Sequence, residues 1–344
     1  MKICVIFTGG TIGSRIGREG YICTDADMPY LLLERYKEIS SGDVWFVTKE
    51  PYCILSENLS AEHIMKLADS VQQALSEKAY DGIIVTHGTD TLQYSGAILG
   101  YLFGHAPIPI LLVSSNYVLD DSRANGLDNF KYAVEFIKGN CGTGVFVSYC
   151  NQGEEAKIHR GTRLQLPVSY SDEVSSVDNS YYGSFRNNKF IKNDQYQTVE
   201  GVQSILGLLN VVDKEGMRPS EYIKLEGKAS EILRVRPYVG MNYPQLSSGI
   251  KVVLHESYHS GTICVGEDMK EFMASAKRLG ILVYLTGLSN KEDAYETVEE
   301  YQNANIISLP DSATIAQYCK LWICISAGMN VEEVMKVSIA EDFI

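Results

Sequence analysis

Two short segments of the chain combine glycines with hydroxyl side chains in a pattern that suits attack on a carbonyl group. Residues 8–13 have the sequence Thr-Gly-Gly-Thr-Ile-Gly and follow an apolar run at residues 3–7. Adjacent glycines let a backbone come close to a substrate and offer N–H groups to an oxyanion. Thr11 then places a hydroxyl where it can attack a carbonyl carbon. A tight turn with a capping threonine explains the same residues, so both interpretations stay open at this point.

The second segment, residues 86–92, has the sequence Thr-His-Gly-Thr-Asp-Thr-Leu and ends another apolar run that begins at residue 82. Thr89 adds a hydroxyl, and Asp90 adds a carboxylate that can bind a substrate ammonium or simply cap the next helix. The first segment lacks the G-x-G-x-x-G spacing of a dinucleotide-binding loop. Ligands of open α/β sheets bind at the carboxyl ends of the strands. We therefore expect both segments to meet at one edge of a parallel sheet.

The remaining sequence supplies the elements that such a sheet needs. Short apolar runs alternate with amphipathic stretches, which is typical of a parallel sheet covered by helices. The predicted strands of the first sheet are residues 2–7, 82–86, 108–113 and 143–149. The predicted helices between them are residues 60–78, with Ser60 as N-cap, 91–103 and 128–138.

The pattern weakens between about residues 170 and 228, where we expect loops, a few short strands and a linker. A second set of elements follows, with predicted strands at 231–235, 250–254 and 281–285 and predicted helices at 267–278 and 312–326. A chain of 344 residues is too long for one ordinary core. The predicted fold class is α/β, with a larger N-terminal parallel-sheet domain (1–190), a linker (191–228) and a smaller C-terminal α/β domain (229–344).

The composition argues against several classes of function. The net charge of −13 lacks the basic footprint that binds a phosphate backbone, so we expect no nucleic-acid partner. The longest apolar runs are too short to span a bilayer, and no signal peptide precedes the first strand, so we expect a cytoplasmic protein without a membrane partner. The eight cysteines form no C-x-x-C pair and suit buried, reduced thiols.

Residues 255–259 spell His-Glu-Ser-Tyr-His, the H-E-x-x-H pattern of zinc proteases. That pattern needs a helix so that both histidines share one face. Here Lys251-Val252-Val253-Leu254 predicts a strand, and Ser260-Gly261-Thr262 predicts a turn. In extended chain the two imidazoles lie roughly 13 Å apart, too far to share a metal ion. We therefore expect no metal site here.

Taken together, TGGTIGS near the N-terminus and THGTDTL further on resemble the two signature motifs of the asparaginase/glutaminase family. This family also includes the asparaginase-like subunit of archaeal glutamyl-tRNA amidotransferases. The resemblance implies an asparaginase-like fold and a threonine nucleophile. The implied catalytic residues are Thr11 as nucleophile, Tyr21 as the mobile-loop tyrosine that activates it, and Thr89 with its acidic neighbour Asp90.

The resemblance also implies a set of substrate-binding residues. Ser56 matches a contact to the substrate α-carboxylate, and Glu57 matches a position that faces the substrate ammonium. The backbones of Gly10 and Gly88 would line the pocket, and Ser115 would supply a carbonyl. In the C-terminal half, residues 258–262 match a loop that a partner subunit lends to the site.

One position departs from the family pattern. Relatives carry a lysine hydrogen-bonded to the second threonine and its aspartate, and the matching residue here is Leu166. A leucine neither polarises Thr89 nor balances the charge of Asp90. Lys157, Arg160 and Arg163 are close in sequence and are the candidates to replace it, although an arginine is a poor base because it stays protonated.

The resemblance implies an L-asparaginase that hydrolyses asparagine to aspartate and ammonia. The implied enzyme has no cofactor, takes a small amino-acid amide as substrate, and forms a homodimer or homotetramer with shared active sites. The departure at Leu166 leaves two alternatives, an amidase of shifted specificity and a catalytically weak amino-acid-binding homologue. Two further rivals are a metalloprotease and an amidotransferase subunit.

Overall fold

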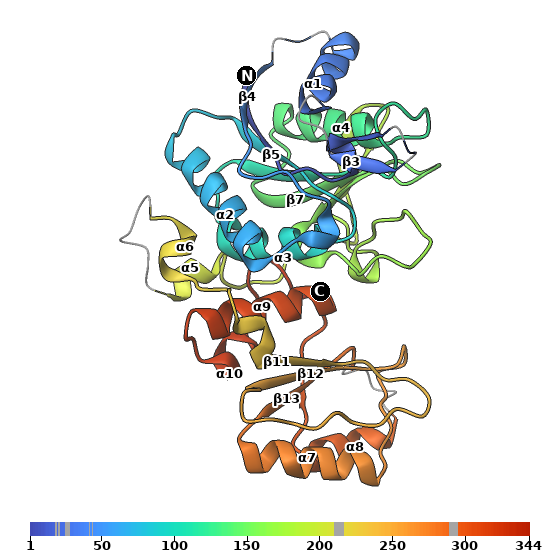
Figure 1. Ribbon diagram of the computed structural model, residues 1–344, viewed down its shortest axis with the longest axis vertical. Helices are drawn as coiled ribbons and strands as arrows, with labels where there is room; N and C mark the ends of the chain where they lie inside the picture. The colour runs from blue at the N-terminus through green and yellow to red at the C-terminus, as the bar shows by residue number, and fades with distance from the viewer. Residues whose placement is uncertain are drawn as a thin grey trace.

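The computed structural model describes residues 1–17, 19, 21–24, 28–40, 42, 44–209, 217–288 and 295–344. Its larger unit is built on an eight-stranded sheet with the strand order β10-β9-β8-β7-β6-β5-β1-β4 (Figure 1). The first five strands in sequence that form this sheet run parallel: β1 (Lys2–Phe7), β4 (Trp45–Lys49), β5 (Gly82–Thr86), β6 (Pro109–Val113) and β7 (Gly144–Tyr149). The last three are antiparallel: β8 (Ala156–Arg160), β9 (Gly183–Arg186) and β10 (Lys189–Lys192).

Helices cover both faces of this sheet because its central strands are apolar on both faces. Every residue of β5, β6 and β7 is buried, as expected for parallel strands between two helical layers. On one face, α2 (Ala61–Ser76) and α3 (Leu92–Phe103) join the main apolar cluster. On the other, α1 (Met28–Ile39) and α4 (Gly126–Lys138) join a second cluster. The predicted N-cap of α2 is confirmed, because the Ser60 side chain accepts from His63 N.

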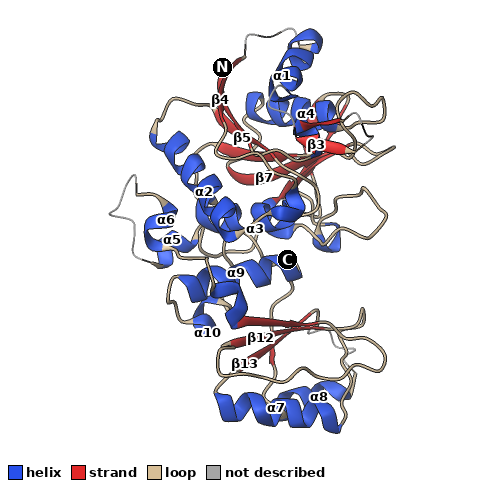
Figure 2. Cartoon of the chain, in the orientation of Figure 1, coloured by secondary structure: helices blue, strands red, loops and turns tan. Residues whose placement is uncertain are grey.

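The smaller unit is a four-stranded parallel sheet in the order β11-β12-β13-β14. These strands are β11 (Ile232–Val235), β12 (Val252–Glu256), β13 (Leu282–Thr286) and β14 (Ile307–Ser308). Figure 2 shows α7 (Glu267–Leu279) and α8 (Thr297–Asn303) on its outer face, and α9 (Thr314–Ser326) and α10 (Val331–Val334) between it and the larger unit. The predicted α/β class with a large parallel sheet is therefore confirmed, and every strand and helix predicted above is present within a few residues.

Several elements lie outside the predicted set. A small hairpin pairs β2 (Ser14–Ile16) with β3 (Ile22–Thr24) directly after the first motif. In the sequence, two short helices lie between the last strand of the larger sheet and the first strand of the smaller one: α5 (Ile205–Leu208) and α6 (Pro219–Tyr222). The division at residues 190 and 229 stays a prediction. Within the described residues, no helix is both long and apolar enough to cross a membrane.

The end of the chain folds back onto the larger unit through residues 338–343, which we call the C-terminal clasp. Val202 N donates to the Ser338 carbonyl at 2.9 Å, and Thr162 Oγ1 donates to the Ala340 carbonyl at 2.8 Å. Arg163 is fully buried, and its guanidinium donates to the carbonyls of Gln197, Glu341 and Phe343. The clasp therefore ties the loop after β8 to the C-terminus.

A buried ion pair anchors this clasp to α9. Lys320 Nζ lies 2.9 Å from Asp342 Oδ2, and both side chains are at most 2% exposed. Tyr101 of α3 donates to the same carboxylate oxygen at 3.0 Å, and Ile339 N donates to the other oxygen at 2.8 Å. Each charge is thus compensated by hydrogen bonds as well as by its partner, which a buried pair needs.

We predict that Lys320→Met lowers the free energy of unfolding by about 3–5 kcal/mol, because the variant leaves the Asp342 carboxylate buried without its cation. The matched control is Lys66→Met, which removes an exposed ion pair with Glu62 and is expected to cost less than about 1 kcal/mol. Urea titration of both variants measures the difference. Equal, small losses in the two variants would contradict the proposed anchoring.

Candidate active site

The two glycine motifs meet at the carboxyl ends of neighbouring strands. β1 pairs with β5 in parallel, with Phe7 opposite Thr86, so residues 8–13 and 86–92 leave the same edge of the sheet. The backbones then touch: a Cβ atom built on Gly10 would lie 2.4 Å from Gly88 N. Gly10 also has a φ of 74°, in the left-handed region that side chains disfavour. Glycine at this position therefore satisfies both a conformational and a steric requirement.

A third segment, residues 54–58, closes around this contact. Gly10 N donates to the Ile54 carbonyl at 2.9 Å, and Ile54 N donates to the Thr8 carbonyl at 3.1 Å. A Cβ atom on Gly88 would lie 2.4 Å from Ser56 Oγ. The expectation that the first glycine pair offers free N–H groups is wrong for Gly10, because this amide is already bonded to Ile54. The role of Gly10 is to allow close approach.

Ser56 and Asp90, predicted from separate segments, are in direct contact. Ser56 Oγ donates to Asp90 Oδ2 at 3.3 Å, and Thr91 Oγ1 donates to the Ser56 carbonyl at 3.0 Å. Ser56 is buried while Asp90 is exposed, so the carboxylate lies at the surface of the site. The N-cap residue of α3 is Thr91, which leaves the Asp90 side chain free of the simple capping role. The Asp90 carboxylate is thus open to solvent beside Ser56.

The two threonines begin the turns that follow these glycines. Thr11 is the first residue of η1 (Thr11–Gly13), a short 3-10 helix, and is partly exposed, as is Thr89. Ser14 Oγ donates to the Gly10 carbonyl at 2.8 Å and holds the Thr11 turn together. The motif contains Ser14, but only the fold shows that its hydroxyl turns back toward Gly10.

The other predicted residues differ in exposure. Tyr21 lies just before β3 with 74% of its surface exposed, so in this conformation it is open to solvent. Glu57 is exposed next to Ser56. Ser115 is fully buried, and its hydroxyl donates to the Tyr117 carbonyl and accepts from Gly126 N. The Ser115 side chain therefore shapes the turn after β6.

None of the three cations considered as substitutes for the family lysine fills that role. Lys157 Nζ pairs with Glu154 at 2.7 Å, and Arg160 Nε pairs with Glu341 at 2.9 Å. Arg163 is held by carbonyls of the C-terminal clasp and of Gln197. In this structure each of the three candidate side chains is thus bonded to another partner, and their role as a substitute stays a prediction.

The loop that leads to Leu166 packs closely against α3. A Cβ atom on Gly100 would meet Thr162 Cγ2 at 2.7 Å, and one on Gly96 would meet Gly161 O at 3.2 Å and Leu164 Cδ1 at 3.5 Å. Leu166 is half-buried against the main apolar cluster.

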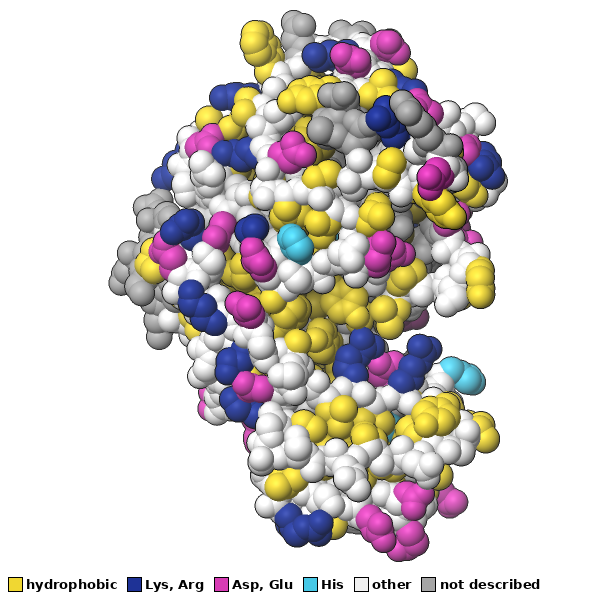
Figure 3. Space-filling view, in the orientation of Figure 1, with side chains coloured by type: hydrophobic (Ala, Val, Ile, Leu, Met, Phe, Trp, Pro, Cys, Tyr) yellow, Lys and Arg dark blue, Asp and Glu magenta, His cyan; other side chains and the backbone are white. Residues whose placement is uncertain are grey.

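A cation that sequence reasoning missed does reach α3. Arg234 at the end of β11 donates to Tyr94 Oη at 3.3 Å and to Glu256 Oε1 at 2.5 Å. Tyr94 lies one helical turn after Asp90. Figure 3 shows the surface hollowed between the two units, with hydrophobic side chains gathered on its upper wall. No pattern in the sequence marks Arg234, because the contact joins residues 140 positions apart.

The H-E-x-x-H segment has the extended geometry that the sequence predicts. His255 is the last but one residue of β12, and its ring nitrogens contact Glu256 O at 2.6 Å and Tyr243 Oη at 3.0 Å. His259 is exposed in the following turn. Among the described residues, no group of three His, Cys, Asp or Glu side chains is placed to hold a metal ion.

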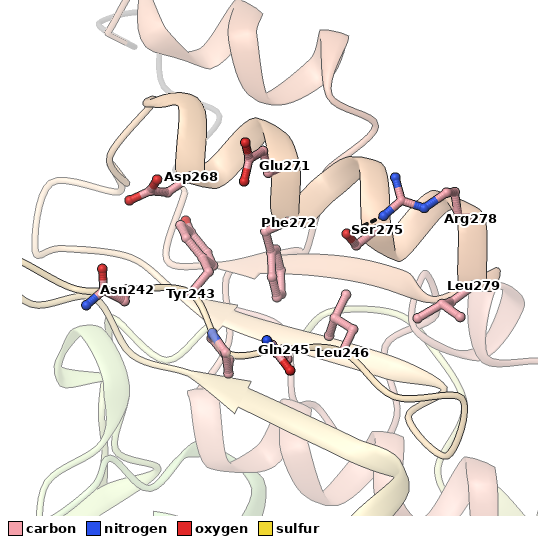
Figure 4. Close-up of a pocket in the computed structure, with 11 residues that line it drawn as sticks. Asn242, Tyr243, Gln245, Leu246, Asp268, Glu271, Phe272, Ser275, Arg278 and Leu279 are labelled. Atoms are coloured by element: carbon pink, nitrogen blue, oxygen red, sulfur yellow. Dashed lines mark hydrogen bonds between the residues drawn. The ribbon is translucent and has the colours of Figure 1, made fainter.

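A separate pocket of about 480 Å³ lies in the smaller unit, between residues 242–246 and α7 (Figure 4). Tyr243 and Phe272 form its apolar wall with ring centroids 4.6 Å apart, and Arg278 donates to Ser275 Oγ at 2.8 Å along its rim. It contains none of the residues predicted for catalysis. The convergence of the two glycine motifs, rather than this pocket, defines the candidate active site.

The glycine contact leads to a stability prediction. Gly10→Ala should lower the free energy of unfolding by at least about 1–3 kcal/mol, because the added Cβ strains the backbone and meets Gly88. The matched control is Gly13→Ala in the same turn, where an added Cβ has no atom within 4 Å and a change below about 1 kcal/mol is expected. Thermal and urea unfolding of both variants test this, and equal stability of the two would rule out the packing constraint.

Comparisons with known proteins agree with this geometry. Residues 2–196 match the family described as Asparaginase, N-terminal. A glutamyl-tRNA(Gln) amidotransferase subunit from Methanosphaera stadtmanae is 26% identical over 98% of this chain and 74% of its own length. The corresponding protein of Methanosarcina acetivorans is 32% identical over 53% of this chain and 43% of its own length.

Solved structures show the same fold. The thermostable L-asparaginase from Thermococcus kodakarensis superposes with a TM-score of 0.74 at 20% identity, over 100% of this chain and 99% of its own. L-asparaginase I from Vibrio cholerae gives a TM-score of 0.73 at 18% identity, with 100% and 99% covered. At these identities the structures support the fold, while the family match rests on more than half of the sequence. The chain belongs to the asparaginase family.

Proposed function

We propose that this protein is an L-asparaginase-type amidohydrolase that uses Thr11 to hydrolyse asparagine to aspartate and ammonia. The contact between Gly10 and Gly88 is the observation that carries the proposal. It brings the Thr11 turn and the Thr89–Asp90 turn to one edge of the sheet, where α/β proteins bind their ligands.

In the proposed reaction the Thr11 hydroxyl attacks the amide carbon and forms a tetrahedral oxyanion. A threonine hydroxyl must lose its proton as it attacks, and Tyr21 on the β2–β3 hairpin helps by relaying it: the phenol oxygen takes the Thr11 proton while the phenol proton passes to the amide nitrogen. The C–N bond then breaks, and the protonated nitrogen leaves as ammonia. Thr89 and Asp90 activate a water molecule that cleaves the acyl ester and restores Thr11.

The substrate is held by groups around the glycine contact. Ser56 binds the α-carboxylate, Glu57 and Asp90 face the ammonium, and Gly88 and Ser115 contribute backbone. The reaction needs neither a metal nor an organic cofactor. By family resemblance, residues 258–262 of a second copy complete the site, so the proposed active form is a homodimer or homotetramer.

A second candidate function is that of an amidotransferase component. It is favoured by the match over 98% of the chain to relatives that are named as glutamyl-tRNA(Gln) amidotransferase subunits. The two functions differ in their requirement for another protein. Ammonia release from free asparagine by the isolated chain supports the first function, whereas release that appears only with a partner chain and charged tRNA supports the second.

We predict that the purified protein releases ammonia from a panel of amides with preference for asparagine, and that Thr11→Ala lowers kcat by at least about 10³-fold, because it removes the nucleophile. Thr11→Ser keeps a hydroxyl and should retain measurable turnover. An enzyme-coupled ammonia assay gives both rates. Undiminished release by Thr11→Ala would show that another group attacks the amide, and binding of aspartate without any turnover would indicate the amino-acid-binding alternative.

A second prediction concerns the missing cation. Leu166→Lys should raise kcat about 10-fold or more, because an ammonium at this position can polarise Thr89 and balance Asp90. Leu166→Met is the control, since it leaves an apolar side chain of similar volume. Steady-state kinetics on asparagine compare the two variants. If the lysine variant is no faster than the methionine variant, the absence of this cation does not limit the reaction.

A further inference from the structure

His87 lies inside the second motif and has no place in the proposed chemistry, yet both of its ring nitrogens are hydrogen-bonded. Nδ1 is 2.8 Å from the Gly88 carbonyl, and Nε2 is 2.8 Å from Ser95 Oγ. The side chains of His87 and Ser95 are each 1% exposed. We infer that His87 and Ser95 are positioning residues that hold the Gly88–Thr89 peptide in place for the reaction proposed above, on which this inference rests.

The chemistry of the partners determines where the ring proton lies. A carbonyl oxygen only accepts, so the hydrogen of the contact to Gly88 must be on Nδ1. In a neutral ring Nε2 then carries a lone pair, and the Ser95 hydroxyl donates to it. Burial lowers the pKa of His87, which agrees with a neutral ring. The Gly88 carbonyl therefore fixes the tautomer, and the Ser95 hydroxyl complements it by donating to Nε2 and holding the ring in place.

The arrangement connects the interior of α3 to the motif that precedes it. Ser95 is the fourth residue of α3, and the main-chain N–H of His87 donates to the Val113 carbonyl of β6 at 2.8 Å. His87 is thus held at its ring by a helix residue and at its main chain by a strand. Because both of these partners are buried, the His87 ring has a fixed position, and its hydrogen bond to Gly88 holds the turn that contains Thr89.

The peptide that His87 holds is the most closely packed point of the site. Gly88 lies between Gly10 and Ser56, and an added Cβ would lie 2.4 Å from the Ser56 hydroxyl. The Gly88 carbonyl and the Thr89 N–H belong to one planar peptide unit. Fixing the carbonyl therefore fixes the direction of the Thr89 amide and the point from which the Thr89 side chain starts. A displacement of about 1 Å in such a group can cost 10²-fold in rate.

The chain offers a matched control for the loss of a buried histidine–serine bond. His159 Nδ1 lies 2.8 Å from Ser176 Oγ, and both residues are buried. This pair connects β8 to the loop at Ser176, which bridges Leu164, and the hydrogen bond of the two side chains joins them to each other and not to Gly88. Ser95→Ala and Ser176→Ala thus remove the same type of bond, in one case next to the motif and in the other case away from it.

The experiment measures kcat and KM for asparagine in Ser95→Ala, Ser176→Ala, His87→Asn and His87→Ala. Ser95→Ala should lower kcat about 10-fold with KM changed less than about twofold, and His87→Ala should lower it about 10²-fold. The amide side chain introduced by His87→Asn keeps an N–H donor at the place of Nδ1. This variant should therefore recover most of the activity lost in His87→Ala. Ser176→Ala should keep the kcat of the unmodified protein. Equal loss of kcat in the two serine variants would overturn the inference.

A second measurement does not depend on turnover. In protein labelled with [¹⁵N]threonine, the Thr89 amide signal should shift in Ser95→Ala and stay unchanged in Ser176→Ala. An unmoved Thr89 signal in Ser95→Ala would overturn the positioning role even where asparagine is hydrolysed. Conversely, a shifted signal in a protein that releases no ammonia from any amide would support the positioning role while refuting the proposed function.

Discussion

The candidate site depends on one backbone contact, that between Gly10 and Gly88. The two glycines lie so close that a single methyl group on either would meet main-chain or Ser56 atoms at 2.4 Å. Because the contact joins loops from adjacent strands, it fixes how far apart the Thr11 and Thr89 turns can lie. Ser14, Ile54 and His87 each hydrogen-bond to one of these loops. The two glycines thus set the separation of the Thr11 and Thr89 turns, and the surrounding hydrogen bonds stabilise it.

The sequence predicts most of the large sheet and its helices because their patterns are local. Strands buried on both faces are continuous apolar runs, and α2 has both an apolar stripe and a serine cap. The edge strand β4 escapes prediction because its pattern is mixed: Trp45 is 74% exposed, and its neighbours are only partly buried. The antiparallel strands β8 to β10 are short and follow loops. The alternation of apolar and polar residues along them covers too few positions to be recognised.

Within the site, predictability follows the same division. Thr11, Thr89 and Asp90 belong to short motifs, so the approach of the two turns that carry them follows from strand order. The residues that support these motifs lie outside any short motif, and their positions could not be predicted. Ser95 looks like any small helix residue until the fold places it beside His87, and Arg234 meets Tyr94 across 140 positions of sequence. Long-range partners of this kind leave no spacing signal, because their approach is set by packing between elements.

The cations near the predicted lysine position show how structural demands can limit chemistry. Arg160 ends β8 and Arg163 lies three residues later, yet both are held by the C-terminal clasp. An arginine that is buried and bonded to three carbonyls cannot swing toward Asp90 without leaving those carbonyls unpaired, at a cost of about 1–3 kcal/mol each. The clasp therefore keeps these charges away from the site, and Asp90 receives a hydrogen bond from the uncharged Ser56 hydroxyl instead. A neutral donor binds a carboxylate less strongly than an ammonium does. The same residues that stabilise the join between β8 and the C-terminus thus leave Asp90 without the charge of Arg160 or Arg163, and in the proposed function this carboxylate faces the ammonium of the amino acid.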